Sequence, residues 1–234
     1  MILSTLFAAA LALADRPAAV VPVADQAAYK AWLADQAIEA EAAFSLKPRC
    51  SDAAVRDIAT TTGPLAKPPP GVRATALAES LTVEGCGRRM RVNIGVLAPL
   101  QGQGWQARTG IPGDSLAGYG LQQQAAHELQ AVLAGRVSAT CVEVGFGEAE
   151  VVARPGGVHL LAVGSPPPKA TPGIFYSALK DPTTLARIAQ DQAWAERWPL
   201  SACGVDASVV ILFGPIRDSD QIYMSISPGW TAAK

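Results

Sequence analysis

Residues 86–96 read CGRRMRVNIGV, and residues 203–213 read CGVDASVVILF. In both segments a Cys-Gly pair precedes a stretch in which apolar side chains recur at every second position. This alternation is typical of a strand with one buried face, and the glycine favours a tight turn or a bulge before it. The alternating residues are Val92, Ile94 and Val96 in the first segment and Val209, Ile211 and Phe213 in the second.

A second cysteine lies upstream of each segment, across a proline-rich stretch. This arrangement predicts two related half-units, residues 15–136 and 137–234, with disulfide bonds Cys50–Cys86 and Cys141–Cys203. The two other possible pairings of four cysteines contradict such half-units. Coincidence is the alternative, because a Cys-Gly pair before a β-branched strand is common. The halves could be separate domains or could share one core.

The N-terminus carries an apolar run, Ile2 to Leu13, that ends in the small-x-small pattern of a signal-peptide cleavage site. It predicts a signal peptide over residues 1–14 and a mature chain from Asp15, in the periplasm or the secreted fraction of a bacterial-type envelope. No Lys or Arg precedes the run, so an apolar N-terminal helix packed on the body is the alternative. An even number of cysteines in an exported chain favours two disulfides.

The composition indicates a globular chain without a nucleic-acid partner. The 234 residues are 50% hydrophobic and 17% charged, with a net charge of −1 and 6% aromatic residues. This chain can bury a core, but it has neither a positive field for phosphates nor many rings for base stacking. No segment after the signal peptide approaches the length of a membrane span. With two histidines and no zinc-like cysteine spacing, we expect no metal and no cofactor.

The fold class predicted is α+β, with antiparallel strand pairs packed against helices. The predicted helices cover residues 25–46, 51–59, 114–133 and 183–198. The predicted strands cover residues 79–84, 90–97, 137–144, 158–163, 207–213 and 221–227.

The segment Gly113-Asp114-Ser115-Leu116 resembles the motif of the GDSL hydrolases. The resemblance covers these four residues and implies that Ser115 is the nucleophile of an esterase-like enzyme. The base would be His127 or His159, although neither has the Asp of the family's Asp-x-x-His block three residues before it. The family's Gly-x-Asn-Asp block is also missing. The alternative is that Asp114 or Ser115 caps the helix predicted to begin there.

Two features are candidates for a binding surface. The densest basic cluster consists of Arg88, Arg89 and Arg91, and Trp105 lies among glycine and glutamine residues on a predicted loop. We therefore expect a non-catalytic exported protein that binds a protein or glycan of the envelope through these loops. The alternatives are a serine hydrolase that uses Ser115 and a structural assembly subunit. The oligomeric state is not determined by the sequence.

Overall fold

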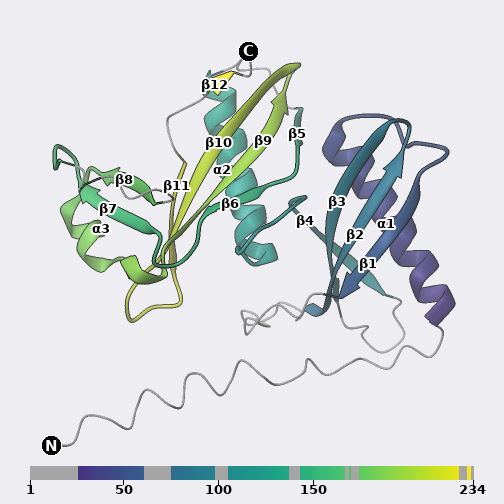
Figure 1. Cartoon of the computed structure of the whole chain (residues 1–234), viewed down its shortest axis with the longest axis horizontal. Coiled ribbons are helices and arrows are strands. Elements are labelled where there is room, and N and C mark those ends of the chain that lie inside the picture. The colour runs from purple at the N-terminus through teal and green to yellow at the C-terminus, as the bar shows by residue number, and fades with distance from the viewer. Residues whose placement is uncertain are drawn as a thin grey trace, which may run out of the picture.

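The computed structural model describes residues 26–60, 75–97, 105–136, 143–166, 169, 174–226 and 231–232. The predicted signal peptide and Cys141 lie outside these residues. The described part contains antiparallel sheets and three α-helices, so the predicted α+β class is confirmed (Figure 1).

The first sheet is an antiparallel meander in the order β1-β2-β3-β4, covered on one face by helix α1. The apolar stripe of α1 and the alternating residues of β2 and β3 form the first core. The elements are α1 (Gln26–Ser45), β1 (Ala54–Thr60), β2 (Thr75–Gly85), β3 (Arg88–Leu97) and β4 (Gln106–Gly110). Helix α1 confirms the prediction for residues 25–46, and β2 and β3 confirm the first predicted strand pair.

The second sheet repeats this order as β5-β9-β10-β11 and is covered by helix α2. Strand β6 also pairs with β9, and β12 pairs with β10. Buried Trp198 and Phe213 contribute to this second core. The elements are α2 (Tyr119–Arg136), β5 (Val144–Phe146), β6 (Glu150–Ala153), β9 (Trp194–Ala202), β10 (Val205–Pro215), β11 (Ile222–Ile226) and β12 (Thr231–Ala232).

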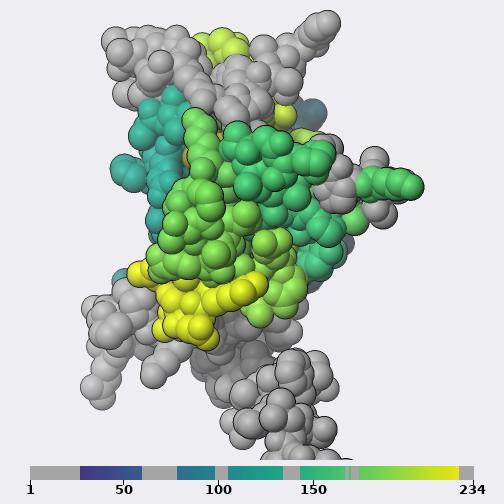
Figure 2. Space-filling view, turned by 90° about the vertical axis from the view of Figure 1, so that its left-hand side faces the viewer, coloured from purple at the N-terminus to yellow at the C-terminus, as the bar shows by residue number. Residues whose placement is uncertain are grey.

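Residues 154–193 are inserted between β6 and β9 and have no counterpart of similar length in the first sheet. Their described part forms a parallel strand pair with a short helix and a 3-10 turn, and it packs on the second sheet through a third core. In Figure 2 these residues, in green, form much of the described surface on that side of the molecule. The elements are β7 (Val158–Ala162), β8 (Phe175–Leu179), α3 (Pro182–Arg187) and η1 (Gln190–Gln192).

The two Cys-Gly pairs form the same two-residue hairpin turn. Cys86 and Gly87 have φ angles of 48° and 69°, and Cys203 and Gly204 have 50° and 79°. Positive φ at both central residues is the signature of a type I′ turn, whose twist matches that of the flanking strands. The six alternating residues identified from the sequence are all buried on the helix-covered faces.

The edge strands are paired in the same register relative to the cysteines. Ala54, the fourth residue after Cys50, pairs with Glu84, the second residue before the first turn. Val144, the third residue after the position of Cys141, pairs with Ala202, the last residue before the second turn. In both pairs the offset from the cysteine exceeds the offset from the turn by two residues, so the register is the same. Helix α1 ends five residues before Cys50, and helix α2 ends five residues before Cys141.

The first predicted disulfide is confirmed: Cys50 and Cys86 are bonded, with their Cα atoms 5.9 Å apart. It joins the chain after α1 to the hairpin turn between β2 and β3. It is the one disulfide whose two cysteines both belong to the described residues. Cys203 is not a free cysteine, but its predicted partner Cys141 lies outside the described residues, so the pairing Cys141–Cys203 stays a prediction.

Two predicted helices are wrong, and one begins late. Residues 54–60 form strand β1 instead of a helix, because they complete the edge of the first sheet. Of the helix predicted over residues 183–198, only α3 exists, and it is capped by Asp181 as expected. Trp194 and Trp198 share a face of strand β9 rather than a helical face. A spacing of four residues fits both the helical period of 3.6 and the strand period of 2. The polar Glu196 lies between the two tryptophans on the same face, so the apolar alternation of a strand is interrupted in the sequence.

Candidate functional site

The three arginines of the basic cluster lie on two faces of β3, because successive side chains of a strand point to opposite sides. Arg88 points to the same side as buried Val92, toward α1. Arg89 and Arg91 point to the opposite side, which we call the outer face of the first sheet. The sequence cluster is therefore divided by the strand that carries it.

Arg88 has a structural role. Its guanidinium donates two hydrogen bonds to the carboxylate of Glu41, with distances of 2.8 and 2.9 Å. The Glu41 side chain is 3% exposed, and a third bond from Arg88 reaches the carbonyl oxygen of Pro48. A fork-to-fork pair of this kind fixes both orientation and distance. It joins the C-terminal end of α1 to the hairpin, and the binding role predicted for Arg88 stays a prediction.

Arg89 and Arg91 line one polar depression of about 410 Å³, together with Thr82 and Glu148. We call these four residues the arginine pocket. The Arg89 side chain is 70% exposed, and its Nε atom lies 3.3 Å from the Glu84 carboxylate. Arg89 can reorient toward a ligand, because an exposed ion pair of this kind contributes little free energy.

The Arg91 side chain is less exposed than that of Arg89, at 39%. Its guanidinium lies 2.8 Å from the carboxylate of Asp114, and its main-chain N–H donates to Glu148. Its Nε atom is buried and has no hydrogen-bond partner among the described residues. The pocket therefore combines one mostly exposed guanidinium with one that is more buried, beside a hydroxyl group and a carboxylate.

The Gly-Asp-Ser-Leu segment belongs to a main-chain connection between the two sheets. The N–H of Gly113 donates to the Arg91 carbonyl on β3, and the segment of residues 112–114 exchanges two hydrogen bonds with Ala149. The neighbouring N–H of Gly147 donates to Pro199 on β9. Gly113 has φ +85°, and a Cβ atom at this position would lie 2.4 Å from the Ala149 carbonyl oxygen. Only glycine fits this close approach without strain.

Ser115 is hydrogen-bonded to a buried glutamate. Its hydroxyl group donates to Glu196 at 2.8 Å, and the carboxylate also accepts the main-chain N–H groups of Leu116 and Ala117. The indole N–H groups of Trp194 and Trp198 complete the set at 2.9 Å each. Glu196 is fully buried. The glutamate therefore anchors the segment before α2 onto the core of the second sheet.

The candidate catalytic residues lie on different elements. Helix α2 begins at Tyr119, so neither Asp114 nor Ser115 caps it, and that prediction is wrong. His127 is exposed on α2, whereas His159 lies on β7 in the insertion, where its ring stacks on Tyr176 at 5.5 Å. The hydrogen-bond acceptor of Ser115 is a carboxylate that five donors already satisfy, so the segment has the geometry of a structural anchor.

Trp105 does not lie beside the exposed arginines. It is half-buried, and its ring packs on Tyr29 of α1 at 5.3 Å, edge to face. It belongs to the border of the first core, on the covered side of the sheet. Trp105 does precede β4 on a loop, as predicted, but its ring is half-buried against α1, and its role in binding stays a prediction.

Buried Tyr29 and half-buried Tyr119 have strongly raised pKa values. Burial raises the pKa of Tyr29, and the nearby carboxylate of Glu79, which accepts a hydrogen bond from its hydroxyl group at 3.1 Å, raises it further. Burial also raises the pKa of Tyr119, with a smaller contribution from Glu79. Both phenols therefore stay neutral well above the pH at which a free tyrosine ionises.

One group of potential metal ligands exists among the described residues, formed by Cys50, Asp52 and Cys86. Its two sulfur atoms are bonded to each other. Metal ions bind thiolates, so the bonded pair offers only the Asp52 carboxylate. That carboxylate accepts the main-chain N–H of Cys86 at 3.2 Å, which is a structural role at the hairpin turn.

None of the described helices combines the length and the apolar content needed to cross a membrane. No known protein family, curated protein or solved structure matches the chain. The structural residues that sequence reasoning missed are Glu148, Thr82 and Glu196. Of these, only Glu196 had a signal in the sequence, because it lies between two tryptophans in the pattern Trp-x-Glu-x-Trp.

Proposed function

We propose that this chain is an exported, non-catalytic binding protein, built from two related half-units, that recognises an acidic glycan at the arginine pocket. The observation that carries the proposal is the shared direction of Arg89 and Arg91. Two guanidinium groups on one face of β3 enter one depression, and one of them is mostly exposed.

The chemistry of the pocket favours a sugar that bears a carboxylate or sulfate group. A guanidinium binds such a group through two parallel hydrogen bonds. The hydroxyl of Thr82 and the carboxylate of Glu148 can exchange hydrogen bonds with sugar hydroxyls. A depression of about 410 Å³ suits one or two sugar rings. A protein partner would need a far larger contact area to bind stably.

The hydrolase alternative has less support. The hydroxyl of Ser115 is engaged by Glu196, which is itself fully buried. A catalytic serine needs a base that accepts its proton and N–H donors that stabilise the oxyanion. Here the hydroxyl of Ser115 and the main-chain N–H groups of Leu116 and Ala117 all donate to the same buried carboxylate, which is a structural arrangement.

The test is a calorimetric titration of the mature protein with trigalacturonate, and with maltotriose as the neutral control. Arg89→Gln should weaken trigalacturonate binding several-fold, because one charge-assisted contact is lost. Arg56→Gln is the matched control, since Arg56 lies on the neighbouring strand β1 and also pairs with Glu84.

Three results would count against the proposal. Equal binding of the two sugars would remove the role of charge. An equal loss in Arg56→Gln and Arg89→Gln would remove the role of the pocket. Binding of a hexaglutamate peptide without any binding of trigalacturonate would indicate a protein partner instead.

Export and the second disulfide are tested together by mass spectrometry of the non-reduced mature protein. We expect a chain that begins at Asp15 and a Cys141–Cys203 crosslink. A retained leader segment, or a thiol at either cysteine that reacts with iodoacetamide, would contradict this part of the proposal.

A further inference from the structure

The second sheet has a hollow at the place where the first sheet has the arginine pocket. Counted from its own Cys-Gly turn, each residue of the arginine pocket on β2 and β3 has a counterpart on β9 and β10. The register confirms the match, since Thr82 pairs with Arg91 as Pro199 pairs with Ser208. The counterparts of Thr82, Arg89 and Arg91 are Pro199, Asp206 and Ser208, and all three line one groove.

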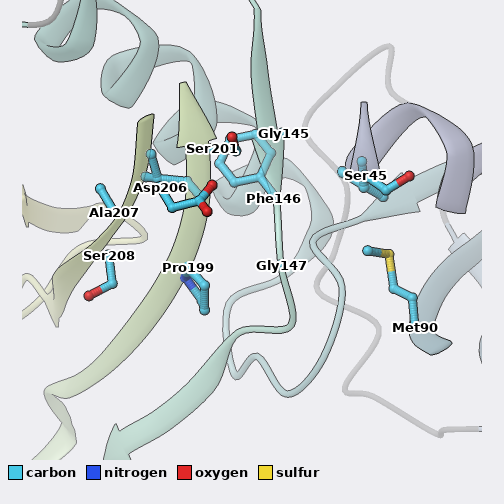
Figure 3. A pocket seen from close by; sticks show the side chains of 12 residues that line it. Ser45, Met90, Gly145, Phe146, Gly147, Pro199, Ser201, Asp206, Ala207 and Ser208 are labelled. Carbon is cyan, nitrogen blue, oxygen red and sulfur yellow. The ribbon is translucent and has the colours of Figure 1, made fainter. Parts of the chain in front are cut away.

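The groove lies where the outer face of the second sheet meets the end of α1. Figure 3 shows Asp206 and Ser208 on one wall, with Ser45 and Met90 of the first half-unit on the opposite wall. Its volume is about 500 Å³, in the range of small-molecule sites.

The groove differs from the arginine pocket in the sign of its charge and in its polarity. Its walls are mostly apolar, and Asp206 is the one charged residue among those that line it. The hydroxyl groups of Ser201 and Ser208 lie on the same sheet face as Asp206 and can accept hydrogen bonds. A ligand with an apolar body would bury it against Met90 and Pro199, and a cationic end would meet the carboxylate.

We propose that this groove is a second binding site, which takes a small amphiphilic cation, an ammonium group on an apolar body. The site takes from the proposed function only the equivalence of the two half-units. The arginine pocket is selective for anions and the groove for cations, because Asp206 and Ser208 stand where Arg89 and Arg91 stand in the first half-unit.

The probe is 4-phenylbutylammonium, compared with the neutral alcohol 4-phenylbutanol, in NMR titrations of the mature protein. Asp206→Asn should weaken binding of the ammonium probe about threefold and leave the alcohol unchanged, which is the effect of one exposed ion pair. Asp220→Asn, which changes an exposed carboxylate outside the groove, is the matched control. Ser208→Phe should abolish binding of both probes by filling the groove.

The proposal is overturned if neither probe binds up to about 10 mM. It is also overturned if the two probes bind equally, or if Asp220→Asn weakens binding as much as Asp206→Asn. Should Ser208→Phe fail to fold, the comparison of the two aspartate variants still decides the question. Arg89→Gln should leave the ammonium titration unchanged, so failure of the glycan site and failure of this site are distinguishable.

Discussion

Replacing Glu196 with Gln should destabilise the protein by about 3 kcal/mol, although the change is nearly isosteric. The carboxylate accepts five hydrogen bonds in a fully buried site. With the amide oxygen at the Oε1 position, three of these bonds remain but become neutral, which costs roughly 1 kcal/mol each. The amide nitrogen at the Oε2 position then faces the indole N–H of Trp198, and this buried donor is left unpaired.

An unpaired buried donor costs about 1–3 kcal/mol, whereas the hydroxyl of Ser115 can turn to accept from the new amide. Part of this loss in the free energy of unfolding is offset, because burying a neutral amide costs less free energy than burying a carboxylate. The net loss of about 3 kcal/mol is measured by guanidinium unfolding followed by tryptophan fluorescence. Glu150→Gln on the adjacent strand β6 is the control and should cost less than about 0.5 kcal/mol. A Glu196→Gln variant as stable as this control would refute the anchoring role.

Three further predictions concern stability. The double variant Cys50→Ser, Cys86→Ser opens a loop with a separation of 36 residues and should lower the free energy of unfolding by about 4 kcal/mol; an unchanged calorimetric melting temperature would contradict this. Gly113→Ala should lower the free energy of unfolding by at least about 2 kcal/mol, because the position has a positive φ and the new Cβ atom would clash with the Ala149 carbonyl oxygen. A smaller loss in chemical unfolding would show that the loop accommodates the methyl group. Because the pKa values of Tyr29 and Tyr119 are raised in the folded protein, the stability they contribute is present below about pH 10 and is lost as the pH rises further; Tyr29→Phe should reduce this alkaline loss, and an unaltered slope of stability against pH would count against it.

The elements with one unambiguous period could be predicted from the sequence. The stripe of α1 and the alternation in β3 and β10 follow from local pattern, and the bond Cys50–Cys86 followed from the comparison of two segments. The error at residues 183–198 has a physical cause. A buried glutamate between tryptophans looks like a polar helix face, and the sequence does not reveal that residues 115–117, far away along the chain, supply three of its hydrogen bonds.

The candidate site could be predicted only in part. The sequence identified the arginine cluster, but it could not show that Arg88 is bound by Glu41, 47 residues away along the chain. It also could not bring Glu148 beside Arg91, because that contact depends on how the two sheets are joined. The match to the Gly-Asp-Ser-Leu motif has a structural reason, since the glycine allows close packing and the serine and the main chain bind Glu196.

The insertion of residues 154–193 has a consequence for engineering. It occupies the connection that in the first sheet takes only residues 61–74, between the edge strand and the central hairpin. The entropy of closing a loop grows with the logarithm of its length, so forty residues in place of fourteen cost only about 1 kcal/mol more. A foreign peptide or small module grafted between β1 and β2 should therefore be displayed without loss of the scaffold.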